Sequence, residues 1–137
     1  MQSAGGTLAS TLGLSNGAVV QEIGHDADSS DEIRAAFTAA TGGDLVDLDY
    51  PDVVDAVLLW FREGDDDLVD LLVDAIAPLA DNGVVWLMTP KPGRPGHVEP
   101  AEISDAAPTA GLQMTRTVSA SADWQGTRLV TPRSNRR

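Results

Sequence analysis

The sequence predicts an α/β fold: three layers, with helices on both faces of a mostly parallel sheet. The strongest observation is a strand–helix–strand unit over residues 55–88, in which two uninterrupted apolar runs flank a stretch with helical periodicity. Helical and strand-like patterns also alternate along most of the chain, which is typical of a parallel sheet covered by helices. A chain of 137 residues is long enough for one such domain.

The first half of the chain contains a helix, a strand, a second helix and a weak strand. We expect a short helix from residue 6 to Gly13, a strand over 18–23, a helix from Ser29 to Gly42 and a weak strand over 44–48. Ser29 and Glu32 have the spacing of a capping box, which predicts where the second helix begins.

The second half contains the two buried strands and ends in a hairpin. We expect strands over 55–61 and 84–88, a helix between them from the aspartates at 65–67 to about residue 80, a helix from Pro100 that ends before Pro108, and strands over 112–120 and 127–132. Asn82 and Gly83 are expected to end the helix before the second buried strand. Trp60 and Trp86 fall within buried strands, so each indole N–H needs a hydrogen-bond acceptor.

An antiparallel hairpin after the last helix is the pattern of class I methyltransferases, so the predicted fold is a Rossmann-like sandwich that resembles a shortened version of that fold. One connection is too short for the complete fold. Seven residues, 49–55, reach roughly 23–25 Å when extended and cannot hold a crossover helix. Either a helix–strand–helix block is missing, or residues 44–48 pair irregularly.

Charge is distributed unevenly along this acidic chain. The formal net charge is −12, with 17 acidic and 2 basic residues over 1–90 but 4 acidic and 7 basic residues over 91–137. An acidic surface argues against nucleic-acid and anionic-membrane partners. The absence of cysteine excludes thiolate chemistry, and no apolar run approaches about 20 residues. We therefore expect a cytoplasmic protein with one domain over 7–132 and disordered ends at 1–6 and 133–137.

The loop "TPKPGRPGHVEP" over residues 89–100 is the best candidate binding site. It places Lys91, Arg94 and His97 at the carboxyl end of a core strand and before the helix that begins at Pro100. Cationic side chains beside the free N–H groups of a helix amino terminus suit phosphate or carboxylate. Two glycines would let the ligand approach the backbone, Gly93 and Gly96. The alternative is a mobile, solvated loop whose basic residues balance an acidic body.

A second candidate is the turn in "VVQEIGHDAD", which resembles a reduced nucleotide-binding loop. Glu22, Gly24 and Asp26 would be its cofactor-binding residues. No second glycine occurs before residue 42, so an ordinary strand-to-helix turn is the favoured interpretation. Asp47 or Asp49 could hold a ribose. We expect no cofactor.

The three consecutive aspartates at 65–67 could in principle bind magnesium. Neighbouring side chains at a helix start point in different directions, whereas the ion needs oxygens placed octahedrally. Helix capping explains these aspartates better, and we expect no metal.

Several segments resemble a known family of small actinobacterial proteins, the domain of unknown function 3052. They are "VVQEIG", "DVVDAVLLWFREGDDDLVDLLVDAI", "LADNGVVWLMTPKPGRPGHVEPAEI", "AAPTAGL" and "DWQGTRLV". The resemblance covers roughly residues 8 to 132. It implies a Rossmann-like fold in a high-GC Gram-positive bacterium and carries no assigned activity. His25 departs from the aromatic residue expected at its position.

These observations favour a small regulatory or adaptor module without catalysis, which binds a protein partner or an anionic small molecule. One alternative is a methyltransferase that uses S-adenosylmethionine with a degenerate cofactor motif. Another is homodimerisation through the hairpin. Trp124 lies between the two last strands and is an interface candidate if it is exposed; packing back onto the domain is the equal alternative.

Overall fold

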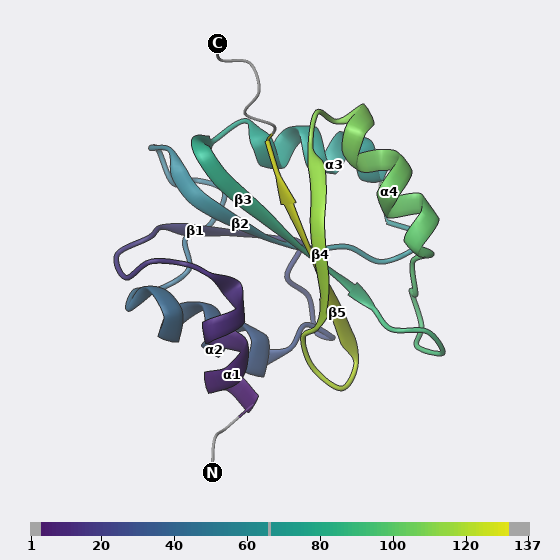
Figure 1. Cartoon of the computed structure of the whole chain (residues 1–137), viewed down its shortest axis with the longest axis horizontal. Helices are drawn as coiled ribbons and strands as arrows, with labels where there is room; N and C mark the ends of the chain where they lie inside the picture. Colours follow the sequence, from purple (N-terminus) through teal and green to yellow (C-terminus); the bar gives the residue numbers. More distant parts are fainter. Residues whose placement is uncertain (1–3, 66, 132–137) are drawn as a thin grey trace.

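The computed structural model describes residues 4–65 and 67–131, which form a five-stranded sheet between two layers of helices (Figure 1). The elements are, in chain order, α1 (Ala4–Leu12), β1 (Val20–Ile23), α2 (Asp31–Thr41), β2 (Val54–Trp60), α3 (Leu68–Ile76), β3 (Leu79–Pro90), α4 (Pro100–Thr109), β4 (Gln113–Ser119) and β5 (Trp124–Val130). Helices α1 and α2 cover one face of the sheet, and α3 and α4 cover the other. The predicted α/β sandwich is confirmed.

The strand order is β1-β2-β3-β5-β4, with β3 in the middle. Strands β1, β2 and β3 are parallel, whereas β5 runs antiparallel to both β3 and β4. The antiparallel hairpin after the last helix is therefore present as predicted. Because the parallel strands end at the same edge of the sheet, the loops that follow them meet there.

The weak strand expected over 44–48 is reduced to a single parallel bridge between Val46 and Gln21. The Val46 N–H donates to the Val20 carbonyl at 2.9 Å, and the Val46 carbonyl accepts from the Glu22 N–H at 2.9 Å. The chain then reaches β2 with no helix between. This geometry satisfies both alternatives: the pairing is irregular, and a block of the full fold is absent.

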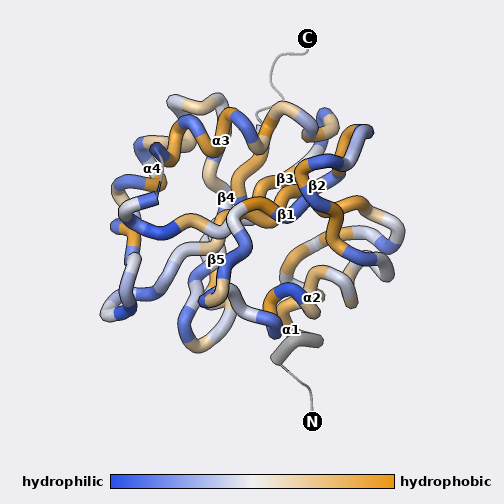
Figure 2. Tube along the Cα trace, turned by 180° about the vertical axis from the view of Figure 1, so that it is seen from behind, coloured by the Kyte–Doolittle hydropathy of each residue, from blue (hydrophilic) through white to orange (hydrophobic). Residues whose placement is uncertain are grey.

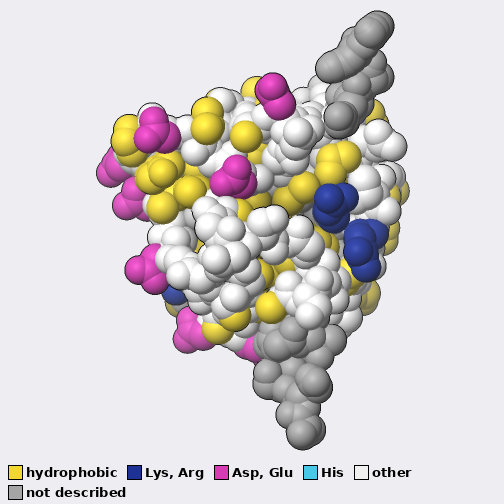
Figure 3. Space-filling model, turned by 60° about the vertical axis from the view of Figure 1, so that its left-hand side comes forward, with side chains coloured by type: hydrophobic (Ala, Val, Ile, Leu, Met, Phe, Trp, Pro, Cys, Tyr) yellow, Lys and Arg dark blue, Asp and Glu magenta, His cyan; other side chains and the backbone are white. Residues whose placement is uncertain are grey.

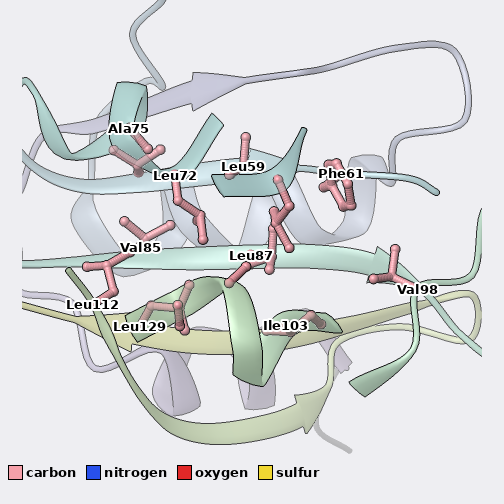
Figure 4. Packing of buried hydrophobic residues seen from close by; sticks show 14 of the residues in the cluster. Leu59, Phe61, Leu72, Ala75, Val85, Leu87, Val98, Ile103, Leu112 and Leu129 are labelled. Carbon is pink, nitrogen blue, oxygen red and sulfur yellow. The ribbon is translucent and has the colours of Figure 1, made fainter. Parts of the chain in front are cut away.

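Two apolar clusters hold the layers together. Figure 2 shows hydrophobic residues concentrated along the inner strands and on the helix faces turned towards them. On one face, Leu72 of α3 and Ile103 of α4 point at Leu87 and its neighbours on the sheet (Figure 4). On the other face, Trp60 and Trp86 are buried as predicted, and the Trp86 indole N–H donates to the Leu12 carbonyl at 3.3 Å.

The start of α2 differs from the predicted capping box. Ser30, not Ser29, is the N-cap, and its Oγ accepts a hydrogen bond from the Ile33 N–H at 3.2 Å. Ser29 Oγ instead accepts from the Asp26 N–H at 2.9 Å, in the turn before the helix. Each of the two serines accepts a backbone hydrogen bond, one in the turn and one at the helix start. Sequence spacing alone does not show which serine takes which role.

The prediction that α3 runs to about residue 80 is wrong. The helix ends at Ile76, and β3 begins at Leu79, so Asn82 and Gly83 lie inside a strand rather than at a helix end. Proline has no N–H with which to continue the helix, and the Pro78 carbonyl accepts from the Val54 N–H of β2 at 2.8 Å. The chain therefore joins the sheet directly after the proline.

Two other helix boundaries also moved. Helix α4 continues past Pro108 to Thr109, because a proline in the last turn removes only one intrahelical hydrogen bond. Helix α1 begins at Ala4 rather than at residue 6, and the predictions for residues 1–3 and 133–137 lie outside the described residues. Among the described residues, no helix is long and apolar enough to span a bilayer.

Candidate functional site

The candidate site lies at the edge of the sheet where β1, β2 and β3 end. Residues 91–99 follow β3, the middle strand, so the loop leaves the sheet where the sequence predicted. The turn between β4 and β5 closes over it, because the Lys91 N–H donates to the Asp123 carbonyl at 2.9 Å. Four segments therefore meet here: the turn after β1, the turn after β2, the loop after β3 and the hairpin turn.

Each of the three basic side chains in this loop has its own partner. Lys91 Nζ lies 2.5 Å from Ser119 Oγ at the end of β4. Arg94 forms an ion pair with Asp123, and both side chains are half exposed. His97 Nδ1 lies 2.9 Å from the Pro90 carbonyl, and its Nε2 lies 3.7 Å from Glu99. The structure thus gathers the three residues in one loop but directs them towards three different elements.

The two loop glycines serve different needs. Both have φ of +86°. A Cβ at Gly96 would lie 3.0 Å from Arg62 Cβ, and the Gly96 carbonyl accepts from the Glu63 N–H at 2.8 Å, so Gly96 packs this loop against the end of β2. A Cβ at Gly93 would meet no heavy atom within 4 Å, so Gly93 is required only for the turn itself.

A cavity of about 300 Å³ opens between this loop and the hairpin turn. Its lining residues are Asp28, Pro90, Arg94, Pro95, Asp123 and Trp124. Arg94 contributes a cation, Trp124 an aromatic ring edge, and the two aspartates contribute carboxylates. Arg94 is the one cation among these lining residues, and it is paired with the half-exposed Asp123.

Arg62 organises the neighbouring part of the edge, and sequence reasoning did not single it out. Its Nε donates to Asp28 Oδ2 at 2.9 Å, its Nη2 to Asp28 Oδ1 at 2.5 Å, and its Nη1 to the Gly24 carbonyl at 3.0 Å. The hydrogen bonds from Arg62 hold the pKa of Asp28 below its ordinary value. One signal was available: Arg62 is one of two arginines in the first 90 residues, and it directly follows a buried strand.

Trp124 packs back onto the domain, which decides between the two alternatives that the sequence left open. It is 4% exposed and is the first residue of β5 rather than part of a turn. Its ring meets Trp60 edge to face with centroids 4.9 Å apart, and the Arg62 guanidinium carbon lies 5.4 Å from the Trp124 ring centroid. Its indole N–H donates to the Asp28 carbonyl at 3.2 Å.

The residues of the predicted cofactor turn are held by contacts within the protein. Glu22 accepts from Arg34 at 2.8 and 2.9 Å and from the Trp60 indole N–H at 2.9 Å. Gly24 has φ of +84°, and a Cβ there would lie 2.4 Å from the Trp60 carbonyl oxygen. Asp26 is exposed. The glycine is therefore needed because β1 ends close against β2, whether or not a ligand binds.

The other aspartates considered from sequence have local roles. Asp47 Oδ1 accepts from the Asp49 N–H at 2.9 Å, which stabilises the turn after the Val46 bridge. Asp65 Oδ2 accepts from the Arg62 N–H at 3.0 Å, and Asp67 is the N-cap of α3 without a side-chain hydrogen bond. Within the described part of the chain, no three potential ligating side chains form a metal-binding group.

The family model described as "Protein of unknown function (DUF3052)" matches residues 9–133. The chain belongs to this family. Two mycobacterial proteins are similar to it, "Uncharacterized protein Rv2239c" of Mycobacterium tuberculosis and "Uncharacterized protein Mb2263c" of Mycobacterium bovis. Each is 55% identical to this chain over 123 residues, which is 90% of this chain and 77% of the mycobacterial protein. The resemblance found in the sequence is confirmed.

Solved structures similar to this DUF3052 protein are methyltransferases. A methyltransferase from Aquifex aeolicus, dependent on S-adenosylmethionine, has a TM-score of 0.66 at 15% identity, covering 93% of this chain and 89% of its own. The mitomycin 7-O-methyltransferase MmcR has a TM-score of 0.68 at 14% identity over 94% and 53%. A chain in a complex between the Haloferax volcanii Trm112 methyltransferase activator and the putative methyltransferase has a TM-score of 0.61 at 15% identity over 96% and 89%. At these low identities the structural likeness shows the fold alone, and that fold is the one predicted.

Proposed function

We propose that this DUF3052 protein is a regulatory or adaptor module without catalysis, and that it binds an anionic group in the cavity beside Arg94 and Trp124. The observation that carries the proposal is the position of Arg62. Its guanidinium binds the Gly24 carbonyl and the Asp28 carboxylate, so a protein side chain occupies the gap between the turns after β1 and β2. The cavity at Arg94 adjoins this side chain through Asp28, which lines the cavity.

Arg94 is the cation that would bind the anion, in a lining that also carries the carboxylates of Asp28 and Asp123. The Arg94–Asp123 ion pair is half exposed, and such pairs contribute at most about 1 kcal/mol, so a ligand carboxylate or phosphate can replace Asp123 at little cost. Lys91 lies on the same loop and carries a further positive charge. A free small molecule and an acidic side chain of a partner protein present the same chemistry, and the fold is shared with a chain solved in complex with the Trm112 activator.

The test uses ¹⁵N-labelled full-length protein titrated with phosphate and with citrate. Chemical-shift changes should be confined to residues 91–99 and Trp124 in the wild type. The double variant Lys91→Ala/Arg94→Ala should lose them while its melting temperature stays within about 2 °C of wild type. Arg116→Ala, which removes a cation elsewhere on the sheet, is the matched control and should retain them. If the double variant unfolds, the loop has a structural role and the anion site is refuted. If the wild-type spectrum shows no chemical-shift changes with either anion, the anion site is refuted as well.

A methyltransferase is the second candidate, favoured by the shared fold and by a cavity of about 400 Å³ at the carboxyl ends of β1 and β2. Its lining residues are Ile23, Gly24, Leu59, Trp60, Gly64, Asp65 and Leu71. Calorimetric titration with S-adenosylhomocysteine separates the candidates. The leading proposal expects no heat of binding for either wild type or Arg62→Ala. Micromolar binding of S-adenosylhomocysteine by either protein would favour the enzyme, and a methylation assay would then test it.

A further inference from the structure

Strand β4 is an open edge of the sheet. Within the described residues it pairs with β5 alone, and six of its seven residues are exposed, Val118 being partly buried. The opposite edge is different, because the backbone of Val46 bridges β1 there. Exposed strand edges present unpaired N–H and C=O groups and are templates for another strand. The register shift between Met114 and Arg116 confines the regular part of the ladder to Arg116–Ser119.

Two arginines stand next to each other at this edge. Arg116 of β4 lies directly opposite Arg128 of β5, so both side chains are on the same face of the sheet. Arg34, Arg62 and Arg94 pair with carboxylates. Among the described residues, by contrast, neither Arg116 nor Arg128 has a carboxylate within 4.0 Å; Arg128 donates to Thr115 Oγ1 at 3.2 Å. Like charges opposite one another are destabilising. In a chain with 21 acidic residues, this unneutralised pair is conspicuous.

A groove of about 660 Å³ adjoins the pair, between α1, α2 and the hairpin. It is lined by Leu8, Thr11, Glu32, Arg116, Val118, Ser119, Ala120, Ser121 and Ala122. Four of its nine lining residues are apolar, Leu8, Val118, Ala120 and Ala122, and Glu32 is its one acidic lining residue. In Figure 3, basic side chains lie together at one margin of the face, and carboxylates gather at the opposite margin. The groove therefore joins a positive margin to an apolar surface beside an unpaired strand.

We propose that the β4 edge and this groove bind an extended peptide segment that carries carboxylate side chains, which joins the sheet as a sixth strand. Backbone hydrogen bonds would run along Arg116–Ser119. Alternate side chains of the peptide would face the arginine pair and the groove, as in other cases of strand addition. The proposal does not depend on the anion cavity, because the two surfaces share none of the residues that bind.

A second copy of the chain fits this edge less well. Arg116 is the midpoint of the seven-residue strand, so full antiparallel pairing of β4 with its own copy would place Arg116 opposite Arg116. That contact would add a third and a fourth guanidinium to an unneutralised pair. A peptide with glutamates at alternate positions reverses the sign of the contact. At about 0.15 M ionic strength the Debye length is about 8 Å, so the acidic body of the protein repels such a peptide only weakly.

The experiment measures fluorescence anisotropy of three labelled, end-blocked peptides with the full-length protein at physiological ionic strength. The first alternates glutamate and valine, the second replaces glutamate with lysine, and the third is the glutamate peptide with alternate backbone nitrogens methylated. We expect the glutamate peptide to bind at least tenfold more tightly than either of the others. Arg116→Gln with Arg128→Gln should weaken it at least tenfold, whereas Arg116→Lys should remain within about twofold of wild type.

Each contrary result is decisive. Equal binding of the glutamate and lysine peptides would overturn the charge argument, and equal binding of the methylated peptide would overturn strand addition. Loss of the fold is checked by the melting temperature, which the exposed position of Arg116 should leave unchanged. Sedimentation velocity of the protein alone tests self-pairing: a dimer abolished by the arginine substitutions would assign the edge to a second copy and refute the peptide.

Discussion

Gly24 offers a test of why a glycine follows β1 in this fold. Gly24→Ala should destabilise the protein for two separable reasons. The first is the positive φ of +84°, which costs an L-residue about 1–2 kcal/mol. The second is the contact of 2.4 Å between the new Cβ and the Trp60 carbonyl oxygen, which must lengthen by about 1 Å for ordinary contact. Gly24 lies just past the end of β1 and against the buried Trp60, and overpacking of this kind costs about 1–3 kcal/mol.

Gly64→Ala is the matched control, because Gly64 has φ of +100° at the same edge and a Cβ there would meet no heavy atom within 4 Å. It should lose about 1–2 kcal/mol, and Gly24→Ala should lose a further 1–3 kcal/mol. Urea denaturation followed by far-ultraviolet circular dichroism measures both free energies of unfolding. If the two variants lose the same stability, the close approach of β1 to β2 does not constrain residue 24, and a ligand would become the better reason for the glycine.

Three further predictions concern stability. Ser30→Ala should cost about 1 kcal/mol in urea denaturation by removing the α2 cap, and Ser30→Asp should restore most of it; equal losses would contradict the cap. Arg62 holds the pKa of Asp28 below its ordinary 3.8, so Asp28 contributes stability, about 1 kcal/mol or less, that is complete above pH 4 and lost as the pH falls through the lowered pKa. The free energies of unfolding of wild type and Asp28→Asn should therefore converge in acid. A difference that stays constant with pH would refute the pairing. Desolvation and the neighbouring Glu63 raise the pKa of Glu102 above its ordinary value of 4.5. The ionised Glu102 carboxylate therefore destabilises the fold as the pH rises above 4.5. Glu102→Gln should raise the melting temperature slightly at pH 7 and leave it unchanged at pH 4.

The fold was predictable wherever the hydrophobic pattern agreed with the glycine, proline and asparagine residues that end helices and strands. Apolar runs around Trp60 and Trp86 identified β2 and β3, and the alternation between them and the helices identified the layers. The errors came where one residue could serve two roles. Asn82 and Gly83 have the composition of a helix end, yet Pro78 had already ended α3, and the sheet continued through them. Leu79 pairs with Val54 and Val84 with Ala56, so Asn82 and Gly83 lie where the register between β3 and β2 shifts, between two paired parts of the strand.

The edge of the sheet was predictable as a place, but its contacts were not. Parallel strands direct their following loops to one edge, and this places Lys91, Arg94 and His97 near the turn after β1. Which acceptor each side chain reaches depends on the hairpin turn, which approaches from another part of the chain. Arg62 illustrates the limit: its position after a strand was evident, but its bond to Asp28 requires β1 and β2 to be adjacent, and strand order was uncertain from sequence.

Arg62 also changes how a negative binding experiment with a cofactor should be interpreted. A ligand entering between the turns after β1 and β2 would have to break the hydrogen bonds of Arg62 with Gly24 and Asp28. Bonds to charged groups contribute about 1.5–3 kcal/mol, and because Asp28 is half exposed about 1–2 kcal/mol is the appropriate range. Since 1.4 kcal/mol is a tenfold change, wild-type affinity would be lowered roughly 5- to 30-fold. Arg62→Ala would recover that factor if a cofactor site existed beneath it. The absence of a heat of binding for both wild type and Arg62→Ala therefore argues against the enzyme. Its absence for wild type alone does not.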